Sequence, residues 1–568
     1  MRPISILFGT ETGNAESCAK ELKGDLAAQG FAAKVYDMVE YPHHALPNER
    51  LVLIVTSTFG HGDPPVNAHD FMAHLKEDSP DVTGIRFSVC ALGDSSFPMF
   101  AQCGKDFDRL LGTLGGERVA ERVDCDGEYE VPFARWKTSV LTYLEANPEL
   151  FPQGAEPEPE ASSGGGFFGW LSRLFGGGAT PAPAAAPKPV PAAAPVTTAA
   201  ARPAGTREDP ITVKLVSNTL LSKAGSNKET RHYVIDLADT GLSFHPGDCF
   251  GVYPENCPEE VAAVVAALGG EAAAQVTWDG ETRSLSDVLT RSACLNSVSM
   301  KLVELLAQSE GPAKAALDGD SEALSTWMSE RLVLDALQAH ASAALDAQAV
   351  VSTLRPMQPR LYSVANSPAQ HPNEVHFTVE TTRYRAHDRD IKGVASCWLA
   401  ERAHETGIPI YLQANPAFRL PGADTPVIMV GPGTGVAPFR AFLQERKASG
   451  ATGKNWLFFG HQHEDRDFLY QDELTGFVDD GTLAELTCAW SRDTDQKVYV
   501  QHKLLERADE VWQWLEAGAA VYVCGDASGM APGVHAALIE LVEARGVADG
   551  EQFLKDLEQA NRYQRDVY

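Results

Sequence analysis

The hydrophobic pattern predicts two regions that alternate strands and helices, one at each end of the chain. Near the start, the apolar runs ISILFGT, RLVLIVTST and RFSVCALGD are separated by stretches with helical periodicity. The alternation returns near the end with TPVIMV, NWLFFG, LTCAWS and AVYVCG. Such alternation is typical of an open, doubly wound parallel sheet. We therefore expect one α/β domain over residues 1–150 and another over residues 425–568.

The middle of the chain has a different pattern. ITVKLVSNTLLS, RHYVIDLADT and GDCFGVYP predict strands before an Ala- and Leu-rich helical stretch, and RLYSVANS, EVHFTVETTRY and IPIYLQA predict strands after it. Runs of consecutive strands favour an antiparallel sheet. We expect a β-barrel built from residues 207–256 and 350–424, with a helical insertion at residues 257–349.

Residues 151–206 separate the first α/β domain from the rest. Gly, Pro and Ala dominate them, as in ATPAPAAAPKPVPAAAPVTTAAARPAG, which cannot bury a core and is typical of a flexible tether. Within the tether, FFGWLSRLF (residues 167–175) has apolar residues at helical spacing. Three interpretations stay open for this segment: a turn that folds back onto a domain, a docking helix for a partner, and a helix on a membrane surface.

Composition restricts the partners and the location. The 568 residues are too many for one hydrophobic core. Lys and Arg number 47 against 77 Asp and Glu, a formal net charge of −30, which argues against nucleic acid or an anionic membrane and favours a basic protein partner. The 10 cysteines form no CxxC pair and no metal-ligand spacing, so we expect neither disulfides nor a metal. No apolar run reaches membrane-spanning length, so we expect a soluble cytoplasmic protein.

Three loops of the first α/β domain carry candidate binding residues. GTETGNAE, at residues 9–16, follows the first strand and opens a helix, so its hydroxyls and backbone N–H groups can hold a phosphate. STFGHGDPP and LGDSSFPMF follow later strands, where an open parallel sheet binds ligands. They place Phe59 and Phe97 at loop tips, which suits a flat ring stacked between two aromatics. An ordinary capped turn, and core packing for Phe97, are the alternatives.

Four carboxylates follow these loops in the sequence: Asp124, Asp126, Glu128 and Glu130. Such a run is either solvated surface or an electrostatic guide for an electron acceptor whose docking face is basic.

RLYS, at residues 360–363, is a candidate flavin-binding strand. Arg360 can hold a pyrophosphate, Tyr362 can lie on an isoalloxazine ring, and Ser363 can hydrogen-bond near flavin N5. GVASCWLAE, which begins at Gly393, places small residues at a helix start and suits a second pyrophosphate contact. A purely structural role is the alternative for a motif as short as RLYS.

The segment TPVIMVGPGTGVAPFR predicts a strand, a glycine turn and a helix. Glycines at 431, 433 and 435 allow the backbone to approach a dinucleotide closely. Further on, SRDTDQKVYVQ surrounds Tyr499 with donors that can bind the extra 2′-phosphate of NADPH, whereas NADH would leave them unpaired. These donors are Ser491, Arg492, Lys497 and Gln501. A basic surface patch without a ligand is the alternative.

The chain ends in NRYQRDVY, with Tyr568 as its last residue. Chain ends usually fray, so a terminal aromatic is either a surface tail or part of a site that the end of the chain reaches. We expect the second, with Asp566 beside Ser363 and Cys524.

Together these motifs resemble the diflavin reductases over essentially the whole chain: a flavodoxin-like FMN domain, an FAD-binding barrel of the ferredoxin-NADP reductase type, and an NADPH-binding domain. The resemblance implies three sets of cofactor-binding residues. For FMN they are Thr10, Thr12, Gly13, Asn14, Ser57, Phe59, Gly60, Gly93, Asp94, Phe97 and Asp126. For FAD they are Arg360, Tyr362, Ser363, Tyr384, Gly393, Val394, Ala395, Ser396 and Tyr568. For NADPH they are Gly431, Gly433, Thr434, Gly435, Ser491, Arg492, Lys497, Tyr499, Gln501 and Asp526.

The resemblance also implies the chemistry. In the family a terminal aromatic, here Tyr568, lies on the FAD ring where the nicotinamide must sit, and Ser363, Cys524 and Asp566 join it as catalytic residues. Within the family, LGDSSFPMFAQCGKDFDRLLGTLGGERV, TGKNWLFFG and RYQRDVY are most similar to the flavoproteins of bacterial NADPH-sulfite reductases. Electrons would pass from NADPH to FAD, to FMN, and then to a sulfite reductase haemoprotein of the beta type. A soluble reductase for another, cytochrome-type haem protein and a flavin-binding scaffold without activity are the alternatives.

Overall fold

The structure, a computed structural model, describes residues 4–10, 13–58, 62, 64–93, 99–126, 129–147, 205–207, 209–341, 345–386, 389–527 and 529–568. Nearly all of the predicted tether, including FFGWLSRLF, lies outside these ranges. In the part of the chain that the structure describes, no helix is long and apolar enough to cross a membrane.

The N-terminal region is a parallel sheet covered on both faces. Its strands are β1 (Ile4–Gly9), β2 (Ala33–Asp37), β3 (Leu51–Ser57), β4 (Arg86–Leu92), β5 (Glu117–Arg118) and β6 (Val123–Cys125). They run in the order β2-β1-β3-β4-β5, and β6 pairs with β4. Helices α1 (Asn14–Ala28) and α4 (Glu130–Ala146) cover one face, and α2 (His69–Glu77), α3 (Gln102–Thr113) and the 3₁₀ turns η1 (His43–Asn48) and η2 (Val66–Ala68) cover the other. The strand order reverses beside β1, so the carboxyl ends of β1 and β3 form the ligand-binding edge of the sheet.

The middle sheet is antiparallel, as expected. Its strands are β7 (Ile211–Leu220), β8 (Thr230–Asp236), β9 (Cys249–Val252), β12 (Arg360–Ser363), β13 (Glu374–Glu380) and β16 (Ile408–Gln413), in the order β12-β9-β16-β7-β8-β13. The two end strands come together, because the rings of Tyr362 and Phe377 lie 5.6 Å apart and the N–H of Ala365 donates to the carbonyl of His376 at 2.8 Å. The sheet therefore curls into a barrel.

Helices fill the chain between β9 and β12. They are α5 (Pro258–Ala267), α6 (Leu285–Arg291), α7 (Met300–Leu306), α8 (Pro312–Leu317), α9 (Ser321–Ser329), α10 (Val333–Gln338) and α11 (Ala347–Val351). A hairpin of β10 (Gln275–Trp278) and β11 (Glu281–Ser284) interrupts them. The sequence predicted a helical insertion at residues 257–349 and did not predict this hairpin. The tight turn joins the strands through Asp279 and Gly280, whose φ angles of 48° and 80° suit an Asp-Gly hairpin.

The C-terminal region is a second parallel sheet in the order β19-β18-β17-β20-β21. Its strands are β17 (Val427–Val430), β18 (Asn455–His461), β19 (Glu485–Trp490), β20 (Ala520–Gly525) and β21 (Tyr563–Val567). Its helices are α14 (Ala437–Ala448), α15 (Glu464–Asp467), α16 (Gln471–Asp479), α17 (Val500–Glu506), α18 (Ala508–Glu516), α19 (Met530–Glu543) and α20 (Gly550–Gln559). Before it come the hairpin β14 (Arg383–Ala386) and β15 (Arg389–Lys392) and the helices α12 (Val394–Glu401) and α13 (Ala403–Thr406).

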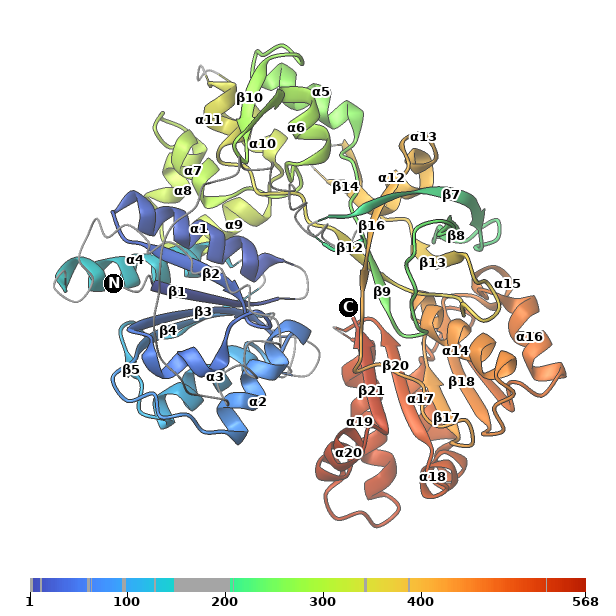
Figure 1. The fold of residues 1–568 in the computed structure, drawn as a ribbon. Helices are drawn as coiled ribbons and strands as arrows, with labels where there is room; N and C mark the ends of the chain where they lie inside the picture. The colour runs from blue at the N-terminus through green and yellow to red at the C-terminus, as the bar shows by residue number, and fades with distance from the viewer. Residues whose placement is uncertain are drawn as a thin grey trace, which may run out of the picture.

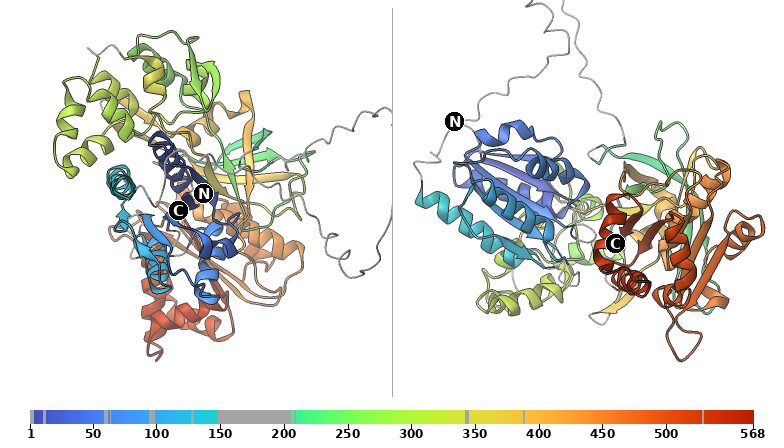
Figure 2. Two further views of the ribbon diagram at one scale, coloured as in Figure 1. Left: turned by 60° about the vertical axis from the view of Figure 1, so that its left-hand side comes forward. Right: turned by 90° about the horizontal axis from the view of Figure 1, so that it is seen from below.

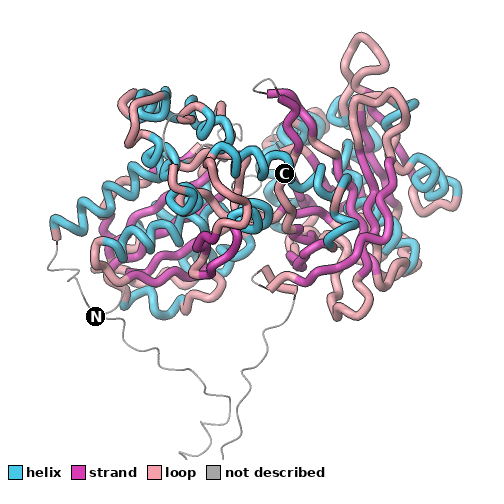
Figure 3. Tube along the Cα trace, turned by 90° about the horizontal axis from the view of Figure 1, so that it is seen from above, coloured by secondary structure: helices cyan, strands magenta, loops and turns pink. Residues whose placement is uncertain are grey.

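The barrel and the C-terminal sheet form one half of the molecule, and the N-terminal sheet lies opposite them (Figures 1 and 2). Helix α4 packs against α7 and α9, and its Val131 belongs to the same apolar core as those helices. The C-terminus lies between the two halves, where the barrel meets the C-terminal sheet (Figures 1 and 3).

Candidate active site

The end of the chain is an ordered strand. Strand β21 pairs in parallel with β20, and the register places Asp566 beside Cys524. The N–H of Tyr568 donates to the carbonyl of Gly525, and the carbonyl of Tyr568 accepts from Ala527, both at 3.1 Å. The tail is therefore not a frayed surface segment, and Tyr568 is held at the junction with the barrel.

Asp566 connects the C-terminal sheet to the barrel. The hydroxyl of Ser363 on β12 donates to Asp566 Oδ2 at 2.8 Å, and Cys524 Sγ lies 3.9 Å from the same oxygen. Asp566 is only 6% exposed. Burial raises the pKa of its carboxyl above the ordinary value, against the opposing effect of the hydrogen bonds from Ser363 and Cys524. These three residues, far apart in sequence, form one buried cluster.

Cys249 belongs to the same cluster, and the sequence reasoning missed it. Strand β9 pairs with β12 so that Cys249 lies opposite Ser363, and its Sγ is 3.8 Å from Ser363 Oγ. Only the register of two distant strands brings them together. Burial, and then the nearby charge of Asp566, raise the pKa of Cys524 well above the ordinary value, which keeps its thiol protonated.

Beside this cluster lies a cavity of about 440 Å³ that is lined by all nine residues predicted to bind FAD. These residues are Arg360, Tyr362, Ser363, Tyr384, Gly393, Val394, Ala395, Ser396 and Tyr568, and Thr434 joins them. Tyr568 is 62% exposed as a residue, and its hydroxyl lies 2.8 Å from Thr434 Oγ1.

The donors of this cavity suit a flavin dinucleotide. Helix α12 begins directly after Gly393, so its free N–H groups can meet a pyrophosphate. The hydroxyl of Ser396 accepts a hydrogen bond from the N–H of Thr382 at 3.0 Å, which fixes this turn. Tyr384 and Tyr568 are exposed, and flat exposed rings at a cavity suit stacking on adenine and isoalloxazine.

The glycine turn after β17 lies directly on β20. A Cβ at Gly435 would come within 2.1 Å of the carbonyl oxygen of Cys524, and one at Gly431 within 2.5 Å of the carbonyl oxygen of Gly435. Gly433 has a φ of 59°. Only glycines allow this close approach, which brings the turn and Thr434 up to the cavity.

The predicted 2′-phosphate residues follow β19. The N–H groups of Ser491 and Arg492 donate to the carbonyls of His461 and Gln462, both at 2.9 Å. The side chains of Arg492, Lys497 and Tyr499 are exposed, and Arg492 and Lys497 form no ion pair within the described residues. Two unpaired cations beside an exposed ring fit a phosphorylated adenosine.

Gln501 and Asp526, two further residues predicted to bind NADPH, differ in whether their side-chain oxygens already have hydrogen-bond donors. The Oε1 atom of Gln501 is buried and meets no hydrogen-bond donor within the described residues. The carboxylate of Asp526 accepts from the N–H groups of Gly529 and Met530 at 2.7 and 2.9 Å. The Asp526 carboxylate therefore binds the backbone where α19 begins, and these bonds already occupy one of its oxygens.

At the N-terminal sheet, the structure describes part of the predicted phosphate loop. Thr10 Oγ1 accepts from the N–H of Gly13 at 2.8 Å, and the N–H of Thr10 donates to Asn67 Oδ1 at 2.9 Å, a contact that the sequence did not indicate. Gly13 has a φ of 91° and caps α1, which begins at Asn14. These two hydrogen bonds fix Thr10 at the end of β1 and Gly13 at the start of α1.

The other predicted FMN residues lie at the ends of neighbouring strands. Ser57 Oγ donates to the carbonyl of Gly9 at 3.4 Å, and the N–H of Gly93 donates to the carbonyl of Cys125 at 2.9 Å, directly before the exposed Asp126. Thr12, Phe59, Gly60, Asp94 and Phe97 lie outside the described residues.

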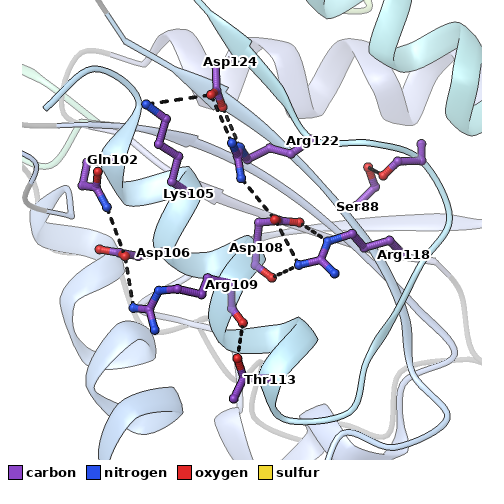
Figure 4. A network of polar contacts seen from close by, with 11 residues as sticks. Ser88, Gln102, Lys105, Asp106, Asp108, Arg109, Thr113, Arg118, Arg122 and Asp124 are labelled. Carbon is purple, nitrogen blue, oxygen red and sulfur yellow. Dashed lines mark hydrogen bonds and ion pairs between the residues drawn. The ribbon is translucent and has the colours of Figure 1, made fainter.

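The acidic run that extends from β6 to the start of α4 is not a row of free carboxylates. Asp124 is bound by Arg122 at 2.7 Å and lies 3.9 Å from Lys105, and Arg122 also bonds Asp108 at 3.1 Å (Figure 4). Glu130 is buried. It forms an ion pair with Arg355, which precedes β12. The interpretation of all four carboxylates as one acceptor-steering patch was therefore wrong for Asp124 and Glu130, because both are neutralised within the chain; Glu128 lies outside the described residues.

Among the described residues, the donor atoms of His371, Glu374 and His376 are close enough to hold a metal ion. Glu374 Oε2 lies 3.0 Å from His376 Nε2, and Arg440 Nη1 lies 3.3 Å from His376 Nδ1. Because a guanidinium only donates, Nδ1 accepts and Nε2 carries the proton given to Glu374. A metal-bound histidine has the opposite pattern. We therefore interpret the group as a hydrogen-bonded junction between β13 and α14.

Three family models match separate parts of the chain, and several known proteins match all of it. The models Flavodoxin, FAD binding domain and Oxidoreductase NAD-binding domain match residues 6–136, 204–398 and 429–536. The sulfite reductase [NADPH] flavoprotein alpha-component of Bacillus subtilis is 40% identical over 578 residues, which cover 100% of this chain and 89% of that protein. The proteins of the same description from Klebsiella pneumoniae and Escherichia coli K12 are each 39% identical, over 574 and 577 residues, with 100% of this chain and 90% of theirs covered.

Proposed function

Since the chain belongs to the family of sulfite reductase NADPH flavoprotein alpha-components, we propose that it delivers electrons to the haemoprotein component of a sulfite reductase. It is an NADPH-dependent oxidoreductase that binds FMN and FAD and transfers electrons from NADPH through FAD to FMN. Bound flavins supply the step from a two-electron hydride donor to one-electron transfer.

The observation that carries the proposed catalytic roles is the bond between Ser363 and Asp566, which joins the barrel to the end of the chain. In our proposal Ser363 presents its hydroxyl to the reacting edge of the flavin. Asp566 holds that hydroxyl, and its negative charge stabilises the positive charge that grows on the nicotinamide as hydride leaves. Cys524 keeps a neutral, buried thiol beside them. These groups orient and stabilise, and none of them has to form a covalent bond.

Tyr568 would cover the flavin until the nicotinamide replaces it. Its exposed ring lines the cavity, and within the described residues its side chain hydrogen-bonds only Thr434. Such a ring can turn aside without leaving a buried polar group unpaired. Arg492 and Lys497 would hold the 2′-phosphate meanwhile, which supports NADPH as the coenzyme.

We place the protein in the cytoplasm, because all of its 10 cysteines are free thiols in the structure. For FFGWLSRLF, which lies outside the described residues, the proposal rests on the sequence alone: its apolar residues would contact the haemoprotein. Deleting residues 167–175 should then weaken co-purification with the haemoprotein while the flavin content stays the same.

Reconstitution tests the proposed acceptor. The purified chain is mixed with a sulfite-reducing haemoprotein, and NADPH oxidation is followed with and without sulfite. We expect sulfite-dependent oxidation, with sulfide as the product. If the chain reduces the haem of a cytochrome at the same rate but never that of the sulfite-reducing protein, the proposed acceptor is wrong while the electron route to FMN stands.

A further inference from the structure

Arg440 lies on α14 at the junction between the C-terminal sheet and the barrel, and it is only 7% exposed (Figure 1). Its Nε atom donates to Glu473 Oε2 on α16 at 2.7 Å, and its Nη1 atom donates to the carbonyl of Ala365 at 2.5 Å. Nη1 also lies 3.3 Å from Nδ1 of His376 on β13, and the guanidinium carbon lies 5.0 Å from the centre of the Tyr470 ring. One buried guanidinium therefore joins the two regions.

Both ends of this contact lead directly to the proposed site of hydride transfer. On the barrel side, Ala365 follows Ser363 by two residues, and its N–H donates to a carbonyl of β13 at 2.8 Å. On the other side, Arg440 lies one helical turn after Ala437, which lines the FAD cavity together with Thr434. The same guanidinium therefore holds the strand that carries Ser363 and the helix that follows the glycine turn.

A second set of hydrogen bonds runs beside Arg440. The N–H of Ser367 donates to Gln444 Oε1 at 3.0 Å, and the hydroxyl of Ser367 donates to Glu445. Gln444 is fully buried, and its Nε2 atom donates to Glu473 Oε1 at 2.8 Å. Glu473 thus binds Arg440 through one carboxylate oxygen and Gln444 through the other. The contacts form one network, which opposes any sliding of α14 along the barrel.

Hydride transfer depends strongly on how the two regions are aligned, because one region binds NADPH and the other binds FAD. Reacting atoms have to approach to about 3–3.5 Å, and a misplacement of ~1 Å can cost about 100-fold in rate. The residues proposed to hold the 2′-phosphate, Arg492 and Lys497, lie on a separate segment after β19. A small shift at the junction should therefore change the rate of hydride transfer and leave coenzyme affinity nearly unchanged.

We propose that Arg440 is a positioning residue for hydride transfer. By bonding Ala365 and Glu473 at once, it keeps the strand of Ser363 in register with the C-terminal sheet. The inference rests on the proposed roles of Ser363 and Asp566, because it is their alignment that Arg440 maintains. Lysine cannot take its place, since a single ammonium group lacks the planar fork that reaches both partners.

The test separates the rate of FAD reduction from the binding of NADPH. The full chain, loaded with both flavins, is mixed with NADPH at a series of concentrations in a stopped-flow instrument, which gives the limiting rate and the Kd. We expect Arg440→Lys to lower the limiting rate by about 10- to 100-fold, a loss typical of imperfect alignment. The Kd for NADPH should stay within about twofold of the wild type.

Arg446→Lys is the matched control. Arg446 is also buried on α14, but its Nη2 atom bonds the carbonyls of Thr425 and Gly453, which both belong to the C-terminal region. This variant should lower the unfolding temperature and keep the limiting rate. If Arg440→Lys does not retain FAD, Glu473→Gln makes the same test at a half-buried position. It removes the charge that Arg440 pairs with and should lower the limiting rate severalfold.

Three results would overturn the inference. The limiting rate of Arg440→Lys could stay within about twofold of the wild type. Arg440→Lys and Arg446→Lys could slow FAD reduction equally, which would assign the effect to the stability of α14. The loss could also appear in the Kd for NADPH instead of the rate. FAD content and the unfolding temperature show that each variant is folded.

Ser363→Ala distinguishes this failure from that of the proposed catalytic roles. If Ser363→Ala slows FAD reduction and Arg440→Lys does not, the role of Ser363 stands and the positioning inference falls. If neither variant slows FAD reduction, both fall.

Discussion

Asp566 is the residue on which the proposed hydride step depends most. It is buried, its carboxylate accepts from Ser363 across the junction, and burial raises its pKa. A carboxylate in such a place has a fixed position and a strong field, because little water screens it.

Replacing Asp566 by Asn keeps the volume and removes the charge. We expect flavin reduction to slow by about 100-fold, a cost typical of one preorganised electrostatic group, with NADPH binding nearly unchanged. Since the pKa of Asp566 is raised, its charge is lost as the pH falls, so the wild-type rate should decline on the acid side at a pH above the usual range of Asp. Stopped-flow measurement of flavin reduction at a series of pH values gives both the loss of rate in Asp566→Asn and the acid-side decline of the wild-type rate. An acid limb that persists in Asp566→Asn would assign it to another group.

We expect Arg492 to determine the preference for NADPH over NADH. Its exposed side chain has no ion-pair partner within the described residues, so its loss leaves no buried group unpaired. Arg492→Ala should raise the KM for NADPH by about 10- to 100-fold and leave that for NADH unchanged. Lys503→Ala is the control, because Lys503 is a nearby cation already paired with Glu506 at 2.6 Å. Equal losses for both coenzymes would make Arg492 a structural residue.

Tyr568 can be tested without shortening the chain. Tyr568→Ala keeps the backbone bonds to Gly525 and Ala527 and removes the ring. NADH lacks the 2′-phosphate anchor and depends more on free access to the flavin, so the preference for NADPH in kcat/KM should fall about tenfold, ~1.4 kcal/mol. Tyr568→Phe loses only the hydroxyl contact with Thr434 and should keep the wild-type preference. A preference unchanged in Tyr568→Ala would mean that the ring does not cover the flavin.

At the scale of elements, local signals predicted more than distant pairing. The strand that begins at Val427, the glycine turn and the following helix could be recognised from the sequence, because the glycines that the turn requires lie close together in one short segment. The hairpin around Asp279 and Gly280 also had a local signal, the Asp-Gly pair, which the Ala- and Leu-rich surroundings obscured. In contrast, Cys249 beside Ser363 and Asn67 beside Thr10 depend on registers and loop contacts that no short segment encodes.

The junction between β13 and α14 predicts a pH dependence of stability. Burial, then Arg440 and His371, lower the pKa of His376 to about 3, and burial with Arg440, His376 and His371 lowers that of His232 to about 3. The folded protein keeps both rings neutral, whereas the unfolded chain binds protons near the ordinary value of 6.5. Unfolding free energy should therefore fall as the pH drops below about 6.5.

His376→Asn tests this pH dependence. It should be less stable than the wild type at neutral pH but lose less stability between neutral pH and pH about 5, the range in which a histidine of ordinary pKa takes up its proton. Denaturant unfolding at both pH values measures the slope. Identical slopes in the wild type and the variant would show that His376 does not contribute.

At the scale of the whole molecule, the N-terminal sheet is held by its first and last helices. Glu130 pairs with Arg355, and Glu21 on α1 lies 3.8 Å from Lys301 on α7. In the proposed function the same sheet presents FMN to an external haemoprotein, so we expect these contacts to be exchanged for contacts with the acceptor. The sequence predicted the separate regions but not this interface, because its ion pairs join residues more than two hundred positions apart.

The most direct test of the electron route removes FMN alone. Thr12→Arg places a long, bulky side chain in the proposed phosphate loop, and its bulk should abolish FMN binding while FAD is retained. Each preparation is assayed for ferricyanide reduction and for sulfite-dependent NADPH oxidation with the haemoprotein. We expect ferricyanide reduction to persist, because FAD still accepts hydride, and sulfite-dependent oxidation to stop. Sulfite-dependent oxidation that continues in the FMN-free, FAD-loaded protein would contradict transfer from FAD through FMN to the acceptor.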